Sequence, residues 1–376
     1  MKHHFLYLLL TLTQTNVLFS QEEDTLRMDF EAYNPVSTLV VPENLVTRAK
    51  YPFIDVHNHQ RSMLDNDLSG LVASMDSLNL AVMVNLSGRG YDRKKRDIKG
   101  MDYFDSVAQN IKTTFPNRFI LFTNVSFKEF GQQGWIEEAL NQLEGDVDNG
   151  ANGLKIYKSL GMRYKDNNEK RVPVDDSRLD PIWAKCAELG IPVLIHSADP
   201  KPFWDTHDEN NERWLELKVR PRRKRSDTDP VPWQQIIQEQ HNLFKKNPKT
   251  IFINAHMGWM ANDLNRVSKH LDDNPNVYVE IGAIIAELGR QPRAARKFFE
   301  KYQDRIMFGK DSWKPKEYHT YFRILETEDE YFPYYKKYHA FWRMYGLGLS
   351  DEILKKVYYK NALKVVPNID ASLFPD

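Results

Sequence analysis

Short apolar runs alternate with longer amphipathic segments from Tyr51 onward, and this alternation constrains the fold more than any other feature of the chain. Short runs rich in Val, Ile and Phe, each followed by a helical pattern, are typical of repeated β-α units around a parallel sheet. We expect eight strands, at residues 53–57, 81–86, 119–123, 153–157, 192–196, 251–256, 277–281 and 306–309. We expect helices between them, for example at 68–78, 135–143, 181–189, 233–244 and 293–302. Eight repeats favour an α/β fold of the closed (β/α)₈ TIM-barrel type over an open doubly wound sheet.

The charge balance limits the partners that the chain can bind. Lys and Arg number 52, and Asp and Glu also number 52, so the formal net charge is zero. Such a chain has no general attraction to nucleic acid or to an anionic membrane, so we expect no nucleic-acid partner. Cys186 is the single cysteine, which excludes an intrachain disulfide. The oligomeric state stays open, and a homo-oligomer is compatible with the sequence.

The first 20 residues have the layout of a secretory signal peptide. Lys2 precedes an apolar stretch over residues 5–10, and acidic residues follow Ser20. Polar residues 11–16 interrupt the apolar stretch well short of the roughly 20 residues that span a bilayer. We therefore expect cleavage near Ser20, a periplasmic or secreted protein, and no membrane span in its mature form. The alternative is a disordered or buried N-terminus.

We expect one barrel domain over residues 51–366, with an N-terminal extension over 21–50 and a C-terminal tail over 367–376. Two segments fall outside the regular repeats. Residues 201–232, between the fifth strand and its helix, are polar and rich in Trp, Pro and charge, which predicts a lid or an inserted loop. Residues 318–366, which end with the segment 351–366, have an aromatic, helical pattern, and we expect this tract to pack across the barrel.

Two histidines end the first predicted strand, within Asp-Val-His-Asn-His. Side chains alternate along a strand, so His57 and His59 project to the same side and can share one metal ion. Histidines in a polar loop are the alternative interpretation.

Three more polar residues follow later strands. His196 closes the fifth strand, His256 closes the sixth, and Asp311 follows the eighth. Each alone has a structural explanation, as a hydrogen-bonded core histidine or a helix cap. In a barrel enzyme, however, the active site gathers at the carboxyl ends of the strands, where all these residues lie. The pattern therefore predicts one shared site.

With these motifs in view, residues 51–366 resemble the amidohydrolase superfamily, in its amidohydrolase-related branch of metal-dependent TIM-barrel hydrolases and decarboxylases. The matching pieces are Phe-Ile-Asp-Val-His-Asn-His from Phe53, Pro-Val-Leu-Ile-His from Pro192, Asn-Ala-His-Met-Gly from Asn254, Met-Phe-Gly-Lys-Asp-Ser from Met307 and Tyr-Lys-Asn-Ala from Tyr359. This set is specific for the superfamily and says much less about the substrate.

The resemblance implies that a divalent ion is held by four residues, His57, His59, His196 and Asp311. Zn²⁺ suits imidazoles and a carboxylate, with Mn²⁺ and Fe²⁺ as alternatives, and one ion is favoured over two. Such an ion lowers the pKa of its water toward about 7. Asp311 would take the proton of that water and deliver it to the leaving group. His256 would hydrogen-bond the oxygen where negative charge develops.

Lys155 leaves the metal count open. Alternation along the fourth strand points Lys155 and Tyr157 into the barrel, where a lone ammonium is costly. Some superfamily relatives carbamylate a lysine here to bridge two metals, and His196 and His256 would then bind the second ion. The alternatives are a lysine paired with a site carboxylate or one that binds an anionic substrate.

Four residues are weaker candidates for substrate binding: Arg89, Glu280, Trp259 and Trp313. Arg89 could hold a carboxylate or be a solvated loop arginine, and Glu280 could line the site or pair with a basic neighbour. The tryptophans could form a pocket wall, although aromatic residues more often serve packing. The basic run at 218–225 is expected to be a solvated loop, or a segment that attracts an acidic substrate.

We expect an exported, metal-dependent hydrolase of a small molecule that cleaves an amide, ester or lactone with a metal-activated water. Nonoxidative decarboxylation of a small carboxylic acid is the first alternative, because the same ligands can support either reaction. An inactive barrel that serves as a binding or scaffold protein is the second.

Overall fold

The computed structural model describes residues 28–375 except 93, 95, 96 and 340. The signal peptide predicted over residues 1–20 lies outside these described residues. The chain divides into an N-terminal unit that ends at Val40 and a large unit from Val41 onward. Residues 28–40 contain one turn, in which the amide of Ala32 donates to the carbonyl oxygen of Asp29 at 3.0 Å.

The large unit is built on eight parallel strands that are paired in chain order. They are β1 (Phe53–Asn58), β2 (Leu80–Asn85), β3 (Phe119–Asn124), β4 (Ala151–Ile156), β5 (Val193–Ile195), β6 (Phe252–Asn254), β7 (Val277–Glu280) and β8 (Ile306–Met307). The amide of Val56 in β1 donates to the carbonyl oxygen of Phe308, just after β8, at 3.0 Å. This bond joins the last strand to the first, so the predicted (β/α)₈ barrel is confirmed.

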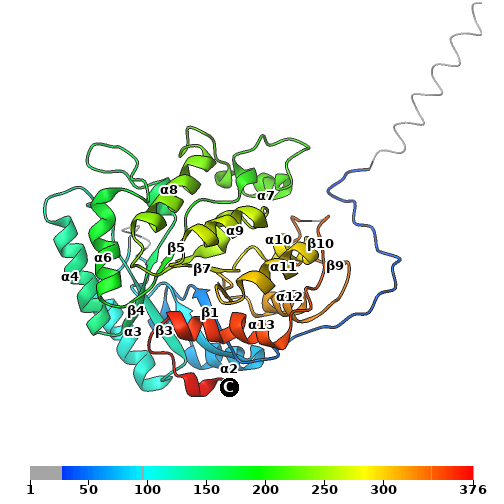
Figure 1. Cartoon of the computed structure of the whole chain (residues 1–376), viewed down its shortest axis with the longest axis horizontal. Coiled ribbons are helices and arrows are strands. Elements are labelled where there is room, and N and C mark those ends of the chain that lie inside the picture. The colour runs from blue at the N-terminus through cyan, green and yellow to red at the C-terminus, as the bar shows by residue number, and fades with distance from the viewer. Residues whose placement is uncertain (1–27, 93, 95–96, 340, 376) are drawn as a thin grey trace, which may run out of the picture. The chain divides into compact units, whose positions relative to one another are not determined.

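One long helix follows each strand, and these helices surround the strands (Figure 1). They are α2 (Leu68–Leu78), α3 (Met101–Thr114), α4 (Trp135–Asp148), α6 (Asp180–Glu188), α8 (Trp233–Lys246), α9 (Leu264–Asp273), α11 (Pro292–Tyr302) and α12 (Pro315–Glu326). Helix α2 shows why the ends were predictable: Asp67 caps its start by accepting from the amide of Gly70, and Asn79 ends it with φ 70°. None of the described helices is long and apolar enough to span a membrane.

Several short helices accompany the eight long ones, and all but the last, which lies near the C-terminus, fall in connections from a strand to its long helix. They are α5 (Ser159–Met162), α7 (Trp214–Val219), α10 (Ile285–Gly289) and the 3-10 helices η1 (Met63–Asp65), η2 (Ser177–Leu179), η3 (Lys201–Phe203), η4 (Pro221–Arg223), η5 (Ala255–Trp259) and η7 (Ala371–Leu373). Three of these, η3, α7 and η4, belong to the insertion between β5 and α8. The insertion predicted over 201–232 is therefore present, but it contains helices rather than loop alone.

The C-terminal part of the chain is less helical than its pattern predicts. Besides α13 (Asp351–Lys355), the π-helical η6 (Lys356–Lys360) and α14 (Asn361–Val365), it contains an antiparallel pair, β9 (Phe332–Pro333) and β10 (Arg343–Met344). Aromatic packing stabilises the connection between these two strands, where the ring centroids of His339 and Trp342 lie 3.9 Å apart. The last helices pack on β8, as expected, since the amide of Phe308 donates to the carbonyl oxygen of Val357 at 2.9 Å.

Candidate active site

The ends of β1 and β8 bring the first predicted site residues together. The amide of Asp311 donates to the carbonyl oxygen of His57 at 2.6 Å. The buried carboxylate of Asp55 adds two bonds through Oδ1, accepting from the amide of His57 at 3.0 Å and from that of Lys310 at 3.1 Å. These bonds join two segments more than 250 positions apart in the sequence, and they place His57 beside Asp311.

Asp55 is a structural residue of the site that the sequence analysis did not single out. Its Oδ2 accepts a hydrogen bond from the hydroxyl of Tyr318 at 2.6 Å. Burial raises the pKa of Asp55 to about 6, although the bond from Tyr318 acts to lower it. The signal was present, because Asp55 stands two positions before His57 and therefore on the same side of the strand.

His57, His59 and Asp311 form a compact cluster that could hold a metal ion. The Nε2 atoms of His57 and His59 lie 3.5 and 3.6 Å from Oδ1 of Asp311. The other nitrogen of each ring is already bonded: Nδ1 of His59 lies 2.9 Å from the hydroxyl of Ser87, and Nδ1 of His57 lies 2.9 Å from Oε1 of Glu280. Both rings therefore present Nε2 toward the same carboxylate oxygen.

The charges of the cluster suit a cation. Burial, helped by the charge of Lys155, lowers the pKa of His57 to about 3, so this ring is neutral at neutral pH. Burial alone would raise the pKa of Asp311, but the neighbouring His57, His256 and His59 rings and Lys155 favour its ionised form more strongly and hold its pKa well below the usual value. Neutral imidazoles and an ionised carboxylate are the protonation states that metal binding requires.

Glu280 holds two histidines of the site and does not face the cavity. Its side chain is fully buried. Besides its bond to His57, Oε1 accepts from the backbone amide of His256 at 2.6 Å, and Oε2 accepts from the amide of Gly282 at 2.5 Å. Glu280 was expected among the substrate-binding residues, whereas its carboxylate accepts from these donors and forms with His57 and His256 a second buried group whose atoms could hold a metal ion.

His256 lies in an unusual backbone segment. The strand predicted over 251–256 ends at Asn254, and His256, Met257 and Trp259 follow with φ of 57°, 49° and 58°. Non-glycine residues with such angles are uncommon and cluster at functional sites. The turn stacks the ring of His256 on that of His57, with centroids 4.8 Å apart.

The hydrogen bond of His256 fixes which nitrogen faces the site. Its Nδ1 lies 2.7 Å from the carbonyl oxygen of Gly282, which can only accept, so Nδ1 carries the proton. Burial lowers the pKa of His256 to about 4, so Nε2 holds a lone pair at neutral pH. The predicted role, donation to a developing negative charge, therefore requires the ring to be protonated first. In its neutral state His256 is a proton acceptor.

His196 does not join the cluster of His57, His59 and Asp311. Its ring makes an edge contact with His256, at 4.5 Å between centroids. Its Nε2 accepts a hydrogen bond from the indole N–H of Trp259 at 3.0 Å. The predicted fourth metal ligand thus lies beside the site with its lone pair occupied, and it could reach an ion only by releasing Trp259.

Lys155 and Tyr157 lie inside the barrel mouth, as the alternation of β4 predicts. Nζ of Lys155 is buried without a hydrogen-bond partner among the described residues. Burial lowers the pKa of Lys155 to about 7, while Asp311 and Glu280 act to raise it. The ring of Tyr157 stacks on that of His59 at 5.6 Å, and its hydroxyl lies 2.8 Å from that of Ser87.

Two of the weaker candidates have structural roles instead. Arg89 is buried, and its Nε and Nη2 donate to Asp146 at 2.8 and 2.9 Å, so it is neither a solvated arginine nor free to hold a substrate carboxylate. The ring of Trp313 packs edge-on against Tyr318 at 5.4 Å and is not among the described residues that line the cavity at the barrel mouth. Trp259 does line that cavity, as predicted.

The cavity at the barrel mouth has a volume of about 530 Å³ and reaches the predicted site at His196, Trp259 and Asp311. This size suits a small organic molecule. Among the residues that the structure describes, eight cationic and four acidic side chains line it, so its lining is strongly basic although the whole chain has no net charge. The inserted segment contributes to the wall through Arg220 and Arg223, which belong to the basic run singled out in the sequence.

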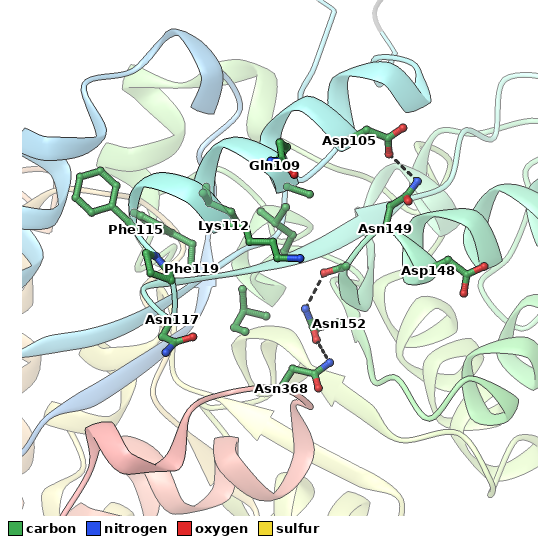
Figure 2. Close-up of a pocket in the computed structure, with 16 residues that line it drawn as sticks. Asp105, Gln109, Lys112, Phe115, Asn117, Phe119, Asp148, Asn149, Asn152 and Asn368 are labelled. Atoms are coloured by element: carbon green, nitrogen blue, oxygen red, sulfur yellow. Dashed lines mark hydrogen bonds between the residues drawn. The ribbon is translucent and has the colours of Figure 1, made fainter.

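A larger pocket of about 650 Å³ lies at the amino ends of β3 and β4, away from the mouth (Figure 2). Several of its polar side chains already bond one another. Nδ2 of Asn149 donates to Asp105 at 2.9 Å, and Nδ2 of Asn368 donates to Asn152 at 2.7 Å. Side-chain amides that are already hydrogen-bonded are less available to a ligand, so the cavity at the barrel mouth is the better candidate for the active site.

The sequence profile of the amidohydrolase family matches residues 127–367, more than half of the chain, so the chain belongs to this family. The resemblance expected from the sequence motifs is thereby confirmed. The matched region contains Lys155, His196, His256 and Asp311, and it begins after His57 and His59. A search of curated proteins gave no match.

Solved structures of decarboxylases share the fold. Dihydroxybenzoic acid decarboxylase from Polaromonas sp. JS666, with bound manganese and the inhibitor 2-nitroresorcinol, has a TM-score of 0.53 at 14% identity over 84% of this chain and 96% of that chain. The 2,6-dihydroxybenzoate decarboxylase from Rhizobium has a TM-score of 0.51 at 12% identity, over 84% of this chain and 98% of that chain. The 5-carboxyvanillate decarboxylase from Sphingomonas paucimobilis has a TM-score of 0.50 at 14% identity, over 81% of this chain and 84% of that chain. At these identities the likeness concerns the fold alone.

Proposed function

We propose that the protein is a metal-dependent hydrolase of small molecules that cleaves an amide, ester or lactone bond. The observation that carries this proposal is the convergence of His57 Nε2 and His59 Nε2 on one oxygen of Asp311, next to the lone pair of His256. Three metal ligands and a neighbouring proton acceptor are the groups that hydrolysis by an activated water needs.

The residues present fit a divalent ion. Nε2 of His57 is buried and has no hydrogen-bond partner among the described residues, which is costly unless a cation takes its lone pair. His57, His59 and Asp311 would hold the ion, and we propose Zn²⁺ because imidazole and carboxylate ligands suit it. When bound, the ion supplies an electrophile and a water of lowered pKa.

The chain's own residues then handle the protons. The ionised Asp311 and the neutral His256 both offer acceptors for the proton of the attacking water. Once protonated, His256 can donate from Nε2 to the leaving group, while Nδ1 stays bonded to Gly282. Glu280 stabilises the charged ring, because Oε1 lies 3.5 Å from Nδ1 of His256.

A carboxy-lyase acting on a small carboxylic acid is the second candidate. The basic lining of the cavity favours it, because a substrate carboxylate would find cationic side chains beside the metal cluster. The decarboxylase structures that share the fold are compatible with this reaction as well. The signal peptide predicted over residues 1–20 favours the hydrolase, since hydrolysis of scavenged compounds suits an exported enzyme; N-terminal sequencing of the mature protein tests the export.

A single assay separates these candidates from an inactive barrel. The purified protein, loaded with Zn²⁺ or Mn²⁺, is incubated with a panel of lactones, esters and amides and a panel of aromatic and enoic acids, with acid and carbon dioxide release followed separately. We expect acid release from the first panel that is lost after chelation. Carbon dioxide release from the second panel would establish the carboxy-lyase instead. Absence of a bound metal after loading would overturn both.

A further inference from the structure

Two segments outside the β-α repeats form one wall of the cavity at the barrel mouth. The first is the insertion that contains α7 and η4, and the second is the stretch between β9 and β10. A buried arginine ties them together. Nη1 of Arg213 donates to Glu216 at 2.8 Å and lies 3.2 Å from Nε2 of His339, and its guanidinium lies 4.8 Å from the ring centroid of Trp342. This wall is therefore a packed structure rather than two independent loops.

Most acidic side chains of the cavity are already paired with cations. Asp199 pairs with Lys158, and Glu216 pairs with Arg213 and with Arg223. Glu317 pairs with Lys310 at 2.7 Å and with Lys314 at 3.4 Å. The fourth acid, Asp311, belongs to the metal cluster. The acidic side chains of the cavity are therefore too few to pair with every cationic side chain of the wall.

Lys336 is the cation in the wall that most needs a partner. It is half-buried, lines the same cavity as Asp311, and forms no ion pair with any described residue. Its Nζ lies 5.8 and 6.0 Å from the rings of Tyr334 and Tyr335. Burial lowers the pKa of Lys336, and so do the charges of Arg213 and Lys310, whereas Glu216 and Glu287 raise it. An ammonium kept in such surroundings is costly to the free protein.

An anionic ligand would remove this cost. Lys337 and Arg220, which are exposed, lie on the same wall, so a ligand anion at Lys336 would meet further positive charge. A cavity of about 530 Å³ is small enough for one molecule to reach both Lys336 and the cluster at Asp311. Recognition at one end of such a molecule would leave its other end at the reacting groups.

We propose that the substrate carries an anionic group, a carboxylate or a phosphate, remote from the bond that reacts, and that Lys336 binds this group. The inference rests on the proposed function, because it names the substrate class of that same site. It applies to the hydrolase and to the carboxy-lyase alike. For the carboxy-lyase it requires a second anionic group besides the carboxylate that leaves.

The test measures binding without turnover. Glutarate, its monoamide glutaramate and inorganic phosphate are titrated by calorimetry into metal-loaded and metal-depleted protein. We expect glutarate to bind about tenfold more tightly than glutaramate, because a charge-assisted bond to the second carboxylate is lost in the amide. Phosphate competition with glutarate in the metal-depleted protein would show that the wall accepts either anion.

Variants assign the effect to the wall. Lys336→Met should abolish the preference for glutarate, whereas Lys336→Arg should retain it. Lys316→Met is the matched control, because Lys316 is exposed at the start of α12 and does not line the cavity. Equal binding of the two compounds by the unmodified protein, or an equal loss in the control, would overturn the proposal. A preference that persists without metal, in a protein that shows no turnover, would keep the anion site and reject the proposed reaction.

Discussion

Oε1 of Glu280 lies 2.9 Å from Nδ1 of His57, and both side chains are fully buried. The bond directs Nε2 of His57 toward Asp311. Because the same carboxylate accepts the backbone amide of His256, one residue at the end of β7 positions both the metal cluster and the neighbouring proton acceptor. Carboxylates that orient metal-bound histidines in this way also raise the basicity of the ring.

Glu280→Gln is expected to lower metal affinity by roughly 10- to 100-fold, because the neutral amide cannot accept all the donors that Glu280 serves. Competition with a chelator of known affinity measures the change. Glu300→Gln, on the exposed face of α11, is the control and should leave the affinity unaltered. Unchanged affinity in Glu280→Gln would show that Glu280 has no part in holding the ion.

Gly309→Ala should disrupt the site through sterics. A Cβ at this position would overlap Oε2 of Glu280 and lie 3.1 Å from Cβ of His57. We expect a loss of metal binding and a drop of ~1–3 kcal/mol in the free energy of unfolding, as for an overpacked core. Gly100→Ala is the control, since no described atom beyond its chain neighbours lies within 4 Å of its Cβ position and its φ is −69°. Equal stability of the two variants would contradict this packing.

His270 on α9 predicts a pH dependence of stability that is independent of the metal site. Burial, helped by His241, lowers the pKa of His270 to about 3 from an ordinary value of 6.5, while Asp273 acts to raise it. At a pH between about 3 and 6.5, His270 is therefore protonated in the unfolded chain and neutral in the folded chain. Protons then favour the unfolded chain, so the free energy of unfolding falls as the pH drops below about 6.5. The free energy of unfolding, measured by denaturant unfolding at several pH values, should fall less steeply with decreasing pH in His270→Phe than in the unmodified protein. An identical slope in both proteins would contradict a neutral, buried His270.

The number of metal ions depends on Lys155. Its pKa of about 7 leaves much of the amine uncharged at pH 8, where it could react with carbon dioxide to form a carbamate. We expect one ion per chain, measured by elemental analysis, and the same value in Lys155→Met, because Nε2 of His57 and Nε2 of His59 converge on one carboxylate oxygen of Asp311. Two ions per chain in the unmodified protein and one in Lys155→Met would instead establish a carbamate on Lys155 that bridges two metals.

The sequence predicted the barrel well because its evidence is local. Each strand is a short apolar run, and helix α2 carries its own start and end signals at Asp67 and Asn79. The antiparallel pair of β9 and β10 was missed because the aromatic residues of this region resemble a helical pattern. Their positions depend on packing with distant segments, such as that of Arg213 against Trp342.

The site was predicted in part. The residues at the strand ends were found because barrel topology brings those ends together. Hydrogen-bond partners could not be found in this way: the bond from Trp259 to His196 and the pair between Arg89 and Asp146 depend on side-chain directions across separate elements. The basic wall was predicted in part: the run at 218–225 supplies Arg220 and Arg223, whereas Lys336 and Lys337 lie more than 100 positions further along the chain and join the wall only through folding.

Anomalous X-ray diffraction from crystals loaded with Zn²⁺ or Mn²⁺ locates the bound ion. We expect a single strong peak in contact with Nε2 of His57, Nε2 of His59 and a carboxylate oxygen of Asp311, at distances of about 2.0–2.2 Å. A loaded crystal without a peak there, or with its ion held by other residues, would show that these three side chains do not form the metal site.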